Sequence, residues 1–151
     1  MSRIDKPFVL IVDDNEATIT LMTALLHREC AVDAATSGRA AIENLHTRNY
    51  DAMILDLRMP DMDGFAVLDF LQRERPEMLR RTIVCTALLM KSELERVAAY
   101  EVCALIAKPF EVEQLLDAVR SCFPPEHKPI GPIFSTGMVL LLADLLRQRL
   151  M

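Results

Sequence analysis

The sequence contains no tryptophan, and aromatic residues make up only 5% of it, so its core must be built from aliphatic side chains and methionine. No uncharged apolar run approaches the roughly 18 residues that would span a bilayer. The first residues, Met-Ser-Arg-Ile-Asp-Lys, also lack the apolar stretch of a signal peptide. We therefore expect a cytoplasmic protein that does not enter a membrane.

Metal-binding cysteine and histidine patterns are absent too. The four cysteines (Cys30, Cys85, Cys103 and Cys122) form no CxxC pair, and no histidine stands at metal-ligand spacing, which argues against a zinc site. We expect all four to be free, mostly buried thiols in a reducing compartment. With a net charge of −5 and no basic stripe, the chain is not expected to bind nucleic acid.

What the sequence does contain is a regular alternation of short apolar runs and amphipathic segments. At 151 residues and 52% hydrophobic, it can form one compact domain with some surplus. Five alternations predict an α/β fold, with a parallel sheet covered on both faces. The expected strands are Phe8–Val12, Ala31–Ala35, 50–56, 81–86 and Ala104–Ala107; the expected helices run from about 15 to 28, from 38 onward, and over 65–75, 91–100 and 111–122.

The last two of these helices differ in apolar character. The segment 91–100 has a weak stripe of Leu94, Val97 and Ala98, which predicts shallow burial and easier movement. The segment 111–122 is strongly periodic. Its apolar positions are Val112, Leu115, Leu116, Val119 and, just beyond it, Phe123.

The composition changes after residue 123, where the first domain (1–123) is expected to end. Four of the 8 prolines lie in the segment 124–134, which predicts a stiff linker. Residues 135–151 predict a final helix whose apolar side chains cover more than half its circumference. Such a helix is not expected to stand alone in water, so it could form a homodimer, pack back on the first domain or lead into an absent output region.

Polar residues stand at the ends of four of the predicted strands. Asp13-Asp14 follow the first strand, Asp56 and Thr86 close the third and the fourth, and Lys108-Pro109 follow the fifth. The carboxyl ends of parallel strands meet at one edge of a sheet, where ligands bind. Three carboxylates, a hydroxyl and an ammonium at one edge indicate a site for a divalent metal and a phosphoryl group.

These residues, in this order and spacing, resemble the receiver domain of two-component response regulators, of the chemotaxis-regulator type. Further matches are Pro60, Gly64, Ala87 and Phe110, and the resemblance runs from about residue 8 to 123. It implies a doubly wound (βα)5 flavodoxin-like fold with a five-stranded parallel sheet in the order 2-1-3-4-5, to which this chain adds a C-terminal helix.

The resemblance implies Mg²⁺ as cofactor. Asp14 and Asp56 would bind the ion directly, Asp13 through water, and the backbone carbonyl of Arg58 would add a ligand. Carboxylates held close together repel one another unless a cation intervenes, and a hard divalent ion with oxygen ligands is the natural partner.

The resemblance also assigns the phosphoryl chemistry. Asp56 would be the nucleophile and the site of phosphorylation, forming an acyl phosphate. Lys108 would hold one phosphoryl oxygen, and Thr86 with the backbone near Ala87 would hold others. The Lys108–Pro109 peptide bond is expected to be cis.

The sequence departs from the family at several positions. Leu105 stands where the family has a tyrosine or phenylalanine that moves together with the threonine, so signalling would depend on the fourth helix and its loop. Arg58 and Leu88 occupy positions that influence the lifetime of the acyl phosphate in the family. Glu101 replaces a usual glycine. Ala104 replaces an aspartate that some receivers use to dimerise, so that dimer is not assumed.

The function implied is a phosphorylation-dependent switch that accepts a phosphoryl group on Asp56 from a sensor histidine kinase or phosphotransfer protein. No enzyme activity is expected beyond self-catalysed transfer and slow hydrolysis, and no DNA-binding output domain is recognisable in this chain. One alternative is a receiver-like adaptor that is never phosphorylated. The other is an aspartate-nucleophile phosphatase of the haloacid-dehalogenase type, disfavoured because the acidic pair comes first and Arg58 stands where that family has a second aspartate.

Overall fold

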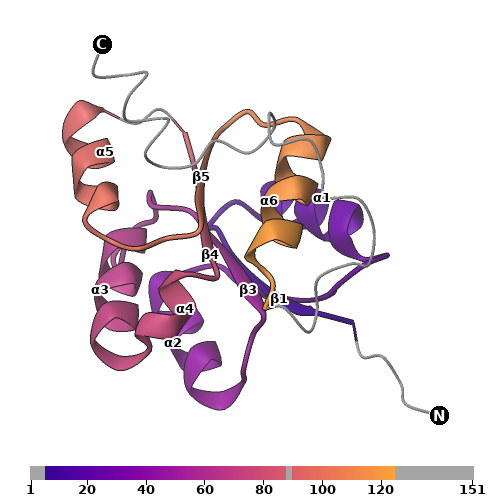
Figure 1. Cartoon of the computed structure of the whole chain (residues 1–151), viewed down its shortest axis with the longest axis horizontal. Helices are drawn as coiled ribbons and strands as arrows, with labels where there is room; N and C mark the ends of the chain where they lie inside the picture. The colour runs from indigo at the N-terminus through magenta and orange to yellow at the C-terminus, as the bar shows by residue number, and fades with distance from the viewer. Residues whose placement is uncertain (1–5, 88–89, 125–151) are drawn as a thin grey trace.

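The computed structural model describes residues 6–87 and 90–124 (Figure 1). Its elements are β1 (Phe8–Val12), α1 (Glu16–Leu26), β2 (Ala31–Ala35), α2 (Gly38–Thr47), β3 (Ala52–Leu55), α3 (Gly64–Glu74), α4 (Pro76–Leu79), β4 (Thr82–Thr86), α5 (Lys91–Ala98), β5 (Ala104–Ala107) and α6 (Val112–Cys122). Apart from Pro124, the predicted linker 124–134 and final helix 135–151 lie outside the described residues. Within those residues, none of the helices is long and apolar enough to cross a bilayer.

The five strands form one parallel sheet in the order β2-β1-β3-β4-β5, which confirms the predicted fold. Every residue of β3 and β4 is buried, as strands covered on both faces require. In the register of the sheet, Val12 is paired with Leu55, and Thr86 is paired with Ala107. The strands that precede the predicted site residues therefore end at the same edge.

Helices cover both faces of the sheet, and each face has its own apolar core. Side chains from α2, α3, α4 and α5 pack on one face, and those from α1 and α6 pack on the other (Figure 1). Alternate residues of one strand supply the two cores: Leu10 belongs to the first, and Val9 and Ile11 belong to the second. The sheet is thus the middle layer of three.

Short polar side chains start three of the helices. Asn15 Oδ1 accepts hydrogen bonds from the Ala17 and Thr18 N–H groups, Ser37 Oγ accepts one from Ala40, and Asp63 Oδ1 accepts one from Ala66. These bonds satisfy N–H groups that have no partner within the helix.

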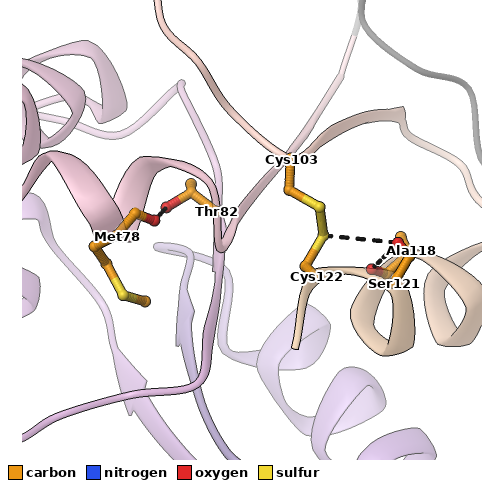
Figure 2. Close-up of a disulfide and its surroundings, with 6 residues drawn as sticks. All are labelled: Met78, Thr82, Cys103, Ala118, Ser121 and Cys122. Atoms are coloured by element: carbon orange, nitrogen blue, oxygen red, sulfur yellow. Dashed lines mark hydrogen bonds between the residues drawn. A yellow bond between two sulfur atoms is a disulfide. The ribbon is translucent and has the colours of Figure 1, made fainter. Parts of the chain in front are cut away.

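The sequence did not predict helix α4. Pro76 ends α3, as expected, but it also occupies the first turn of α4, where its missing N–H and fixed φ are tolerated. The Thr82 hydroxyl then donates to the Met78 carbonyl oxygen at 2.8 Å, which ties this short helix to the start of β4 (Figure 2).

The prediction of four free thiols is wrong for one pair. Cys103 and Cys122 form a disulfide between the residue before β5 and the last residue of α6 (Figure 2). The two residues are 19 positions apart in the sequence, but α6 packs back against the sheet and brings their Cα atoms to 5.9 Å, a separation typical of disulfides. Cys30 and Cys85 are free and buried, as predicted.

Candidate functional site

The carboxyl edge of the sheet gathers five of the residues that the sequence singled out. Asp13 and Asp14 follow β1, Asp56 follows β3, Thr86 ends β4, and Lys108 follows β5. Backbone hydrogen bonds to a neighbouring strand fix three of these positions. The N–H groups of Asp13, Asp56 and Lys108 donate to the carbonyl oxygens of Ala35, Val12 and Thr86, respectively. The ladder of the sheet therefore extends into the site.

The three aspartates form an acidic cluster. One carboxylate oxygen from each of Asp13, Asp14 and Asp56 lies within 4.8 Å of the others. Asp13 and Asp56 are only 2% and 7% exposed, whereas Asp14 is exposed. Two largely desolvated carboxylates beside a third, with only oxygen donors, fit a hard divalent cation such as Mg²⁺ that retains part of its water shell.

Lys108 supplies a positive charge to this cluster. Its Nζ lies 2.6 Å from Asp13 Oδ2 and 3.4 Å from Asp56 Oδ2. Burial alone would lower the pKa of Lys108, but the hydrogen bond to Asp13 and the charges of Asp56 and Asp13 together hold it above its ordinary value. The ammonium therefore stays charged at neutral pH. The Lys108–Pro109 peptide bond is cis, as expected.

Asp56 is held by two donors on one oxygen. Its Oδ1 accepts a hydrogen bond from Thr86 Oγ1 at 2.9 Å and another from the Arg58 N–H at 3.1 Å. Thr86 is completely buried, so its hydroxyl is turned toward the carboxylate rather than toward solvent. These two contacts fix the orientation of the Asp56 carboxylate.

Gly64 packs directly beneath this aspartate. A Cβ atom at residue 64 would lie 2.4 Å from the Asp56 carbonyl oxygen and 2.6 Å from Leu57 Cα. The Gly64 N–H donates to the Leu57 carbonyl at 3.0 Å, closing the loop between β3 and α3. The close backbone approach explains why glycine stands here.

Two of the departures from the family pattern, Leu105 and Arg58, lie on the side of the site that faces α5. Leu105 is fully buried in the core on the α5 face. Its aliphatic side chain has no group that can form a hydrogen bond. The guanidinium of Arg58 forms an ion pair with Glu93 of α5, with Nη2 2.8 Å from Oε1. Leu88 lies outside the described residues, and the role of the Arg58 carbonyl as a metal ligand stays a prediction.

Sequence reasoning did not identify Glu93. One signal was available. Glu93 stands three residues after Met90, the N-cap residue of α5, and a glutamate at that position can accept a hydrogen bond from the N-cap N–H. That N-cap residue is methionine rather than serine, threonine, aspartate or asparagine, so the usual capping pattern was incomplete.

Comparison with known families identifies the class of this domain. Residues 9–120 match the response regulator receiver domain. The acidic cluster, Thr86 and Lys108 all fall within that range. The chain belongs to the response regulator receiver domain family, as the sequence resemblance predicted.

Curated relatives carry this domain within longer proteins. The signal transduction histidine-protein kinase BarA of Escherichia coli is 32% identical over 108 residues, which cover 71% of this chain but only 12% of that protein. The response regulator ArlR of Staphylococcus haemolyticus is 32% identical over 117 residues, which cover 75% of this chain and 51% of that protein. The chain therefore spans an eighth to a half of the length of these relatives.

Solved structures agree on the fold. A CheY-like receiver domain protein from Methanospirillum hungatei aligns with a TM-score of 0.72 at 23% identity, covering 77% of this chain and 92% of that one. The receiver domain of an HD domain-containing protein from Pseudomonas fluorescens aligns with a TM-score of 0.74 at 22% identity, covering 84% and 93%. The chain thus has the receiver fold over its described part.

Proposed function

We propose that this domain is a phosphorylation switch in which Asp56 accepts a phosphoryl group from a histidine kinase or a phosphotransfer protein. The observation that carries the proposal is the placement of the Asp56 carboxylate between Thr86, Lys108 and the other two aspartates of the acidic cluster. The domain would act in the cytoplasm, and it would turn over no substrate beyond its own phosphorylation and the hydrolysis of its acyl phosphate.

The transfer needs few groups. A carboxylate oxygen of Asp56 forms a bond to phosphorus while the bond from phosphorus to the donor imidazole nitrogen breaks, and the electron pair stays on that nitrogen. Lys108 offers a fixed positive charge to a phosphoryl oxygen, and the Thr86 hydroxyl can donate to another. Such chemistry depends on positioning and on charge neutralisation, both of which these side chains supply.

The three aspartates would hold Mg²⁺, which would offset their negative charge and that of the phosphoryl oxygens. Chelating the ion is then expected to leave the three carboxylates repelling one another and the phosphoryl oxygens. Neutral substitution of Asp14, the exposed member of the cluster, would weaken metal binding without opening the core.

The test is intact-protein mass spectrometry after incubation with acetyl phosphate and Mg²⁺. We expect one added phosphoryl group on the wild type, and none on Asp56→Asn or in the presence of EDTA. Replacing Asp61, an exposed aspartate in the following loop, with asparagine is the matched control and should leave the adduct intact.

A negative result separates the remaining alternatives. If no adduct forms and beryllofluoride also fails to bind, the domain is a receiver-like adaptor that is not phosphorylated. Sustained turnover of phosphate esters with Asp56 as the nucleophile would instead indicate a phosphatase.

A further inference from the structure

Arg58 connects the proposed phosphorylation site to helix α5. Its backbone N–H donates to Asp56 Oδ1 at 3.1 Å, and its guanidinium Nη2 lies 2.8 Å from Glu93 Oε1. One residue therefore contacts the phosphoacceptor through its main chain and α5 through its side chain.

Glu93 binds two groups: the Arg58 guanidinium and the backbone at the start of α5. The same atom, Glu93 Oε1, accepts a hydrogen bond from the Met90 N–H at 3.2 Å, just before the first turn of the helix. The ion pair with Arg58 thus helps to fix the carboxylate that caps α5. If Arg58 leaves, Glu93 loses a charged partner and α5 loses a link to the loop after β3.

The ion pair is placed where it can be exchanged at little cost. The Arg58 side chain is 51% exposed and that of Glu93 is 26% exposed. Pairs this accessible contribute only about 0 to 1 kcal/mol to stability. A phosphoryl group carries a charge of about −1.5 to −2 and several acceptor oxygens. A guanidinium can therefore donate more hydrogen bonds to a phosphoryl group than to one carboxylate oxygen.

The packing of α5 leaves its first turn dependent on polar contacts. Only Leu94 and Val97 of the helix are buried, and the Arg96 guanidinium lies over the Phe65 ring at 3.9 Å from its centre. Leu105, beneath the same face, has no group that could form a hydrogen bond with a moving threonine. A signal that passes to α5 from the loop after β3 needs a polar side chain that reaches from one to the other, and Arg58 does so.

We propose that phosphorylation of Asp56 draws the Arg58 guanidinium from Glu93 to a phosphoryl oxygen, and that the released Glu93 loosens the start of α5. The exchange rests on the proposed function, because it requires a phosphoryl group on Asp56. It makes Arg58 a positioning residue for the switch, and it makes Glu93 a competitor of the phosphoryl group for one guanidinium.

Competition of this kind has a thermodynamic signature. Glu93→Gln removes the competing charge, so it should bind beryllofluoride about two- to fivefold more tightly in the presence of Mg²⁺, the range expected for an exposed ion pair. A titration followed by amide NMR measures this affinity. Arg58→Gln should bind it more weakly. Glu93→Gln placed in the Arg58→Gln background should have no further effect, because the guanidinium that both groups compete for is gone.

Hydrogen exchange supplies a second readout. Amides 90–97 of the wild type should lose protection when beryllofluoride binds, whereas in Glu93→Gln they should be less protected from the outset and change little. Glu101→Gln is the matched control, because it removes an exposed glutamate that lies outside the site. The Oε2 atom of Glu101 is 3.1 Å from Nη2 of Arg80. It should behave as the wild type does.

The outcomes distinguish this inference from the proposed function. If the wild type takes up neither phosphoryl group nor beryllofluoride, the proposed function fails and the exchange fails with it. If the wild type binds beryllofluoride but Glu93→Gln binds it equally well, only the exchange is overturned. The exchange is also overturned if the effect of Glu93→Gln persists without Arg58.

Discussion

Helices α5 and α6 cover opposite faces of the sheet, and different kinds of contact hold them. Besides an ion pair between Arg120 and Glu29, helix α6 buries Leu115, Ala118 and Val119, and its last residue is bonded covalently to Cys103. Helix α5 buries two apolar side chains and is otherwise tied by Arg58 and by the Arg96–Phe65 contact. Apolar and covalent contacts do not respond to a new charge, whereas ion pairs do. A change at Asp56 should therefore be felt at α5 while α6 stays in place.

The largest expected effect concerns the apolar anchor of α6. Leu115→Ala removes a fully buried side chain from the core and should lower the free energy of unfolding by about 4 kcal/mol. Urea denaturation measures it. Leu21→Ala, at an exposed leucine of α1, is the control and should cost less than about 0.5 kcal/mol. Similar losses for both would contradict the tight packing of α6.

The next effect concerns the covalent anchor. Reducing the Cys103–Cys122 bond frees a loop of 19 residues, which should destabilise the domain by about 3 kcal/mol. Urea denaturation of oxidised and reduced protein gives the difference, and Cys103→Ser with Cys122→Ser should match the reduced form. An unchanged midpoint would mean that α6 does not depend on the bond.

Thiol reactivity checks the same anchor independently. Burial raises the pKa of Cys30 to about 11 and that of Cys85 to about 12, so both should react slowly with iodoacetamide in the native state at pH 8. Rapid labelling should appear only after reduction, at Cys103, which is partly exposed. Fast labelling of Cys85 would show that the core on this face opens readily.

A smaller effect concerns the ion pair between α6 and the turn that follows α1. Arg120 Nε donates to Glu29 Oε2 at 2.9 Å, and this hydrogen bond, against an opposing effect of burial, holds the pKa of Glu29 below its ordinary value of 4.5. The resulting stability is present above pH 4.5 and is lost as the pH falls through the lowered pKa. Glu29→Gln should therefore cost below about 1 kcal/mol at pH 7 and less near pH 3. An equal cost at both values would indicate lost packing instead.

The smallest effect on stability is expected for α5. Glu93→Gln should change the free energy of unfolding by no more than about 0.5 kcal/mol, because the pair with Arg58 is exposed. If α5 is the responsive helix, the substitution with the least thermodynamic cost will change the response to phosphorylation most. A cost of several kcal/mol in urea denaturation would show that Glu93 serves the fold rather than the switch.

The sequence predicted the layered fold well because its signals were local and repeated. The range of β5 is the one predicted from its apolar run, and the contrast between the weak stripe of α5 and the strong one of α6 reappears in their burial. The order of the strands came from the family resemblance, and the structure has it. Helix α4 was missed because Pro76 was interpreted only as the end of a helix.

The site was predicted where its residues follow strands, and missed where it depends on contacts between distant elements. The sequence placed Asp13, Asp56 and Lys108 at one edge, and the structure brings them together. The disulfide and the Arg58–Glu93 pair join segments whose approach is set by helix packing. No spacing along the chain encodes that packing.

The missing side chain at residue 64 has a consequence for mutagenesis. The Asp56 carbonyl leaves no room for even a methyl group there, so Gly64→Ala must displace the main chain that carries the proposed phosphoacceptor. A saturation screen scored by phosphorylation would then mark residue 64 as strongly as Asp56 itself, although glycine offers no functional group. Sensitivity to substitution in such a screen would therefore report the backbone packing around Asp56 as well as the reactivity of its carboxylate.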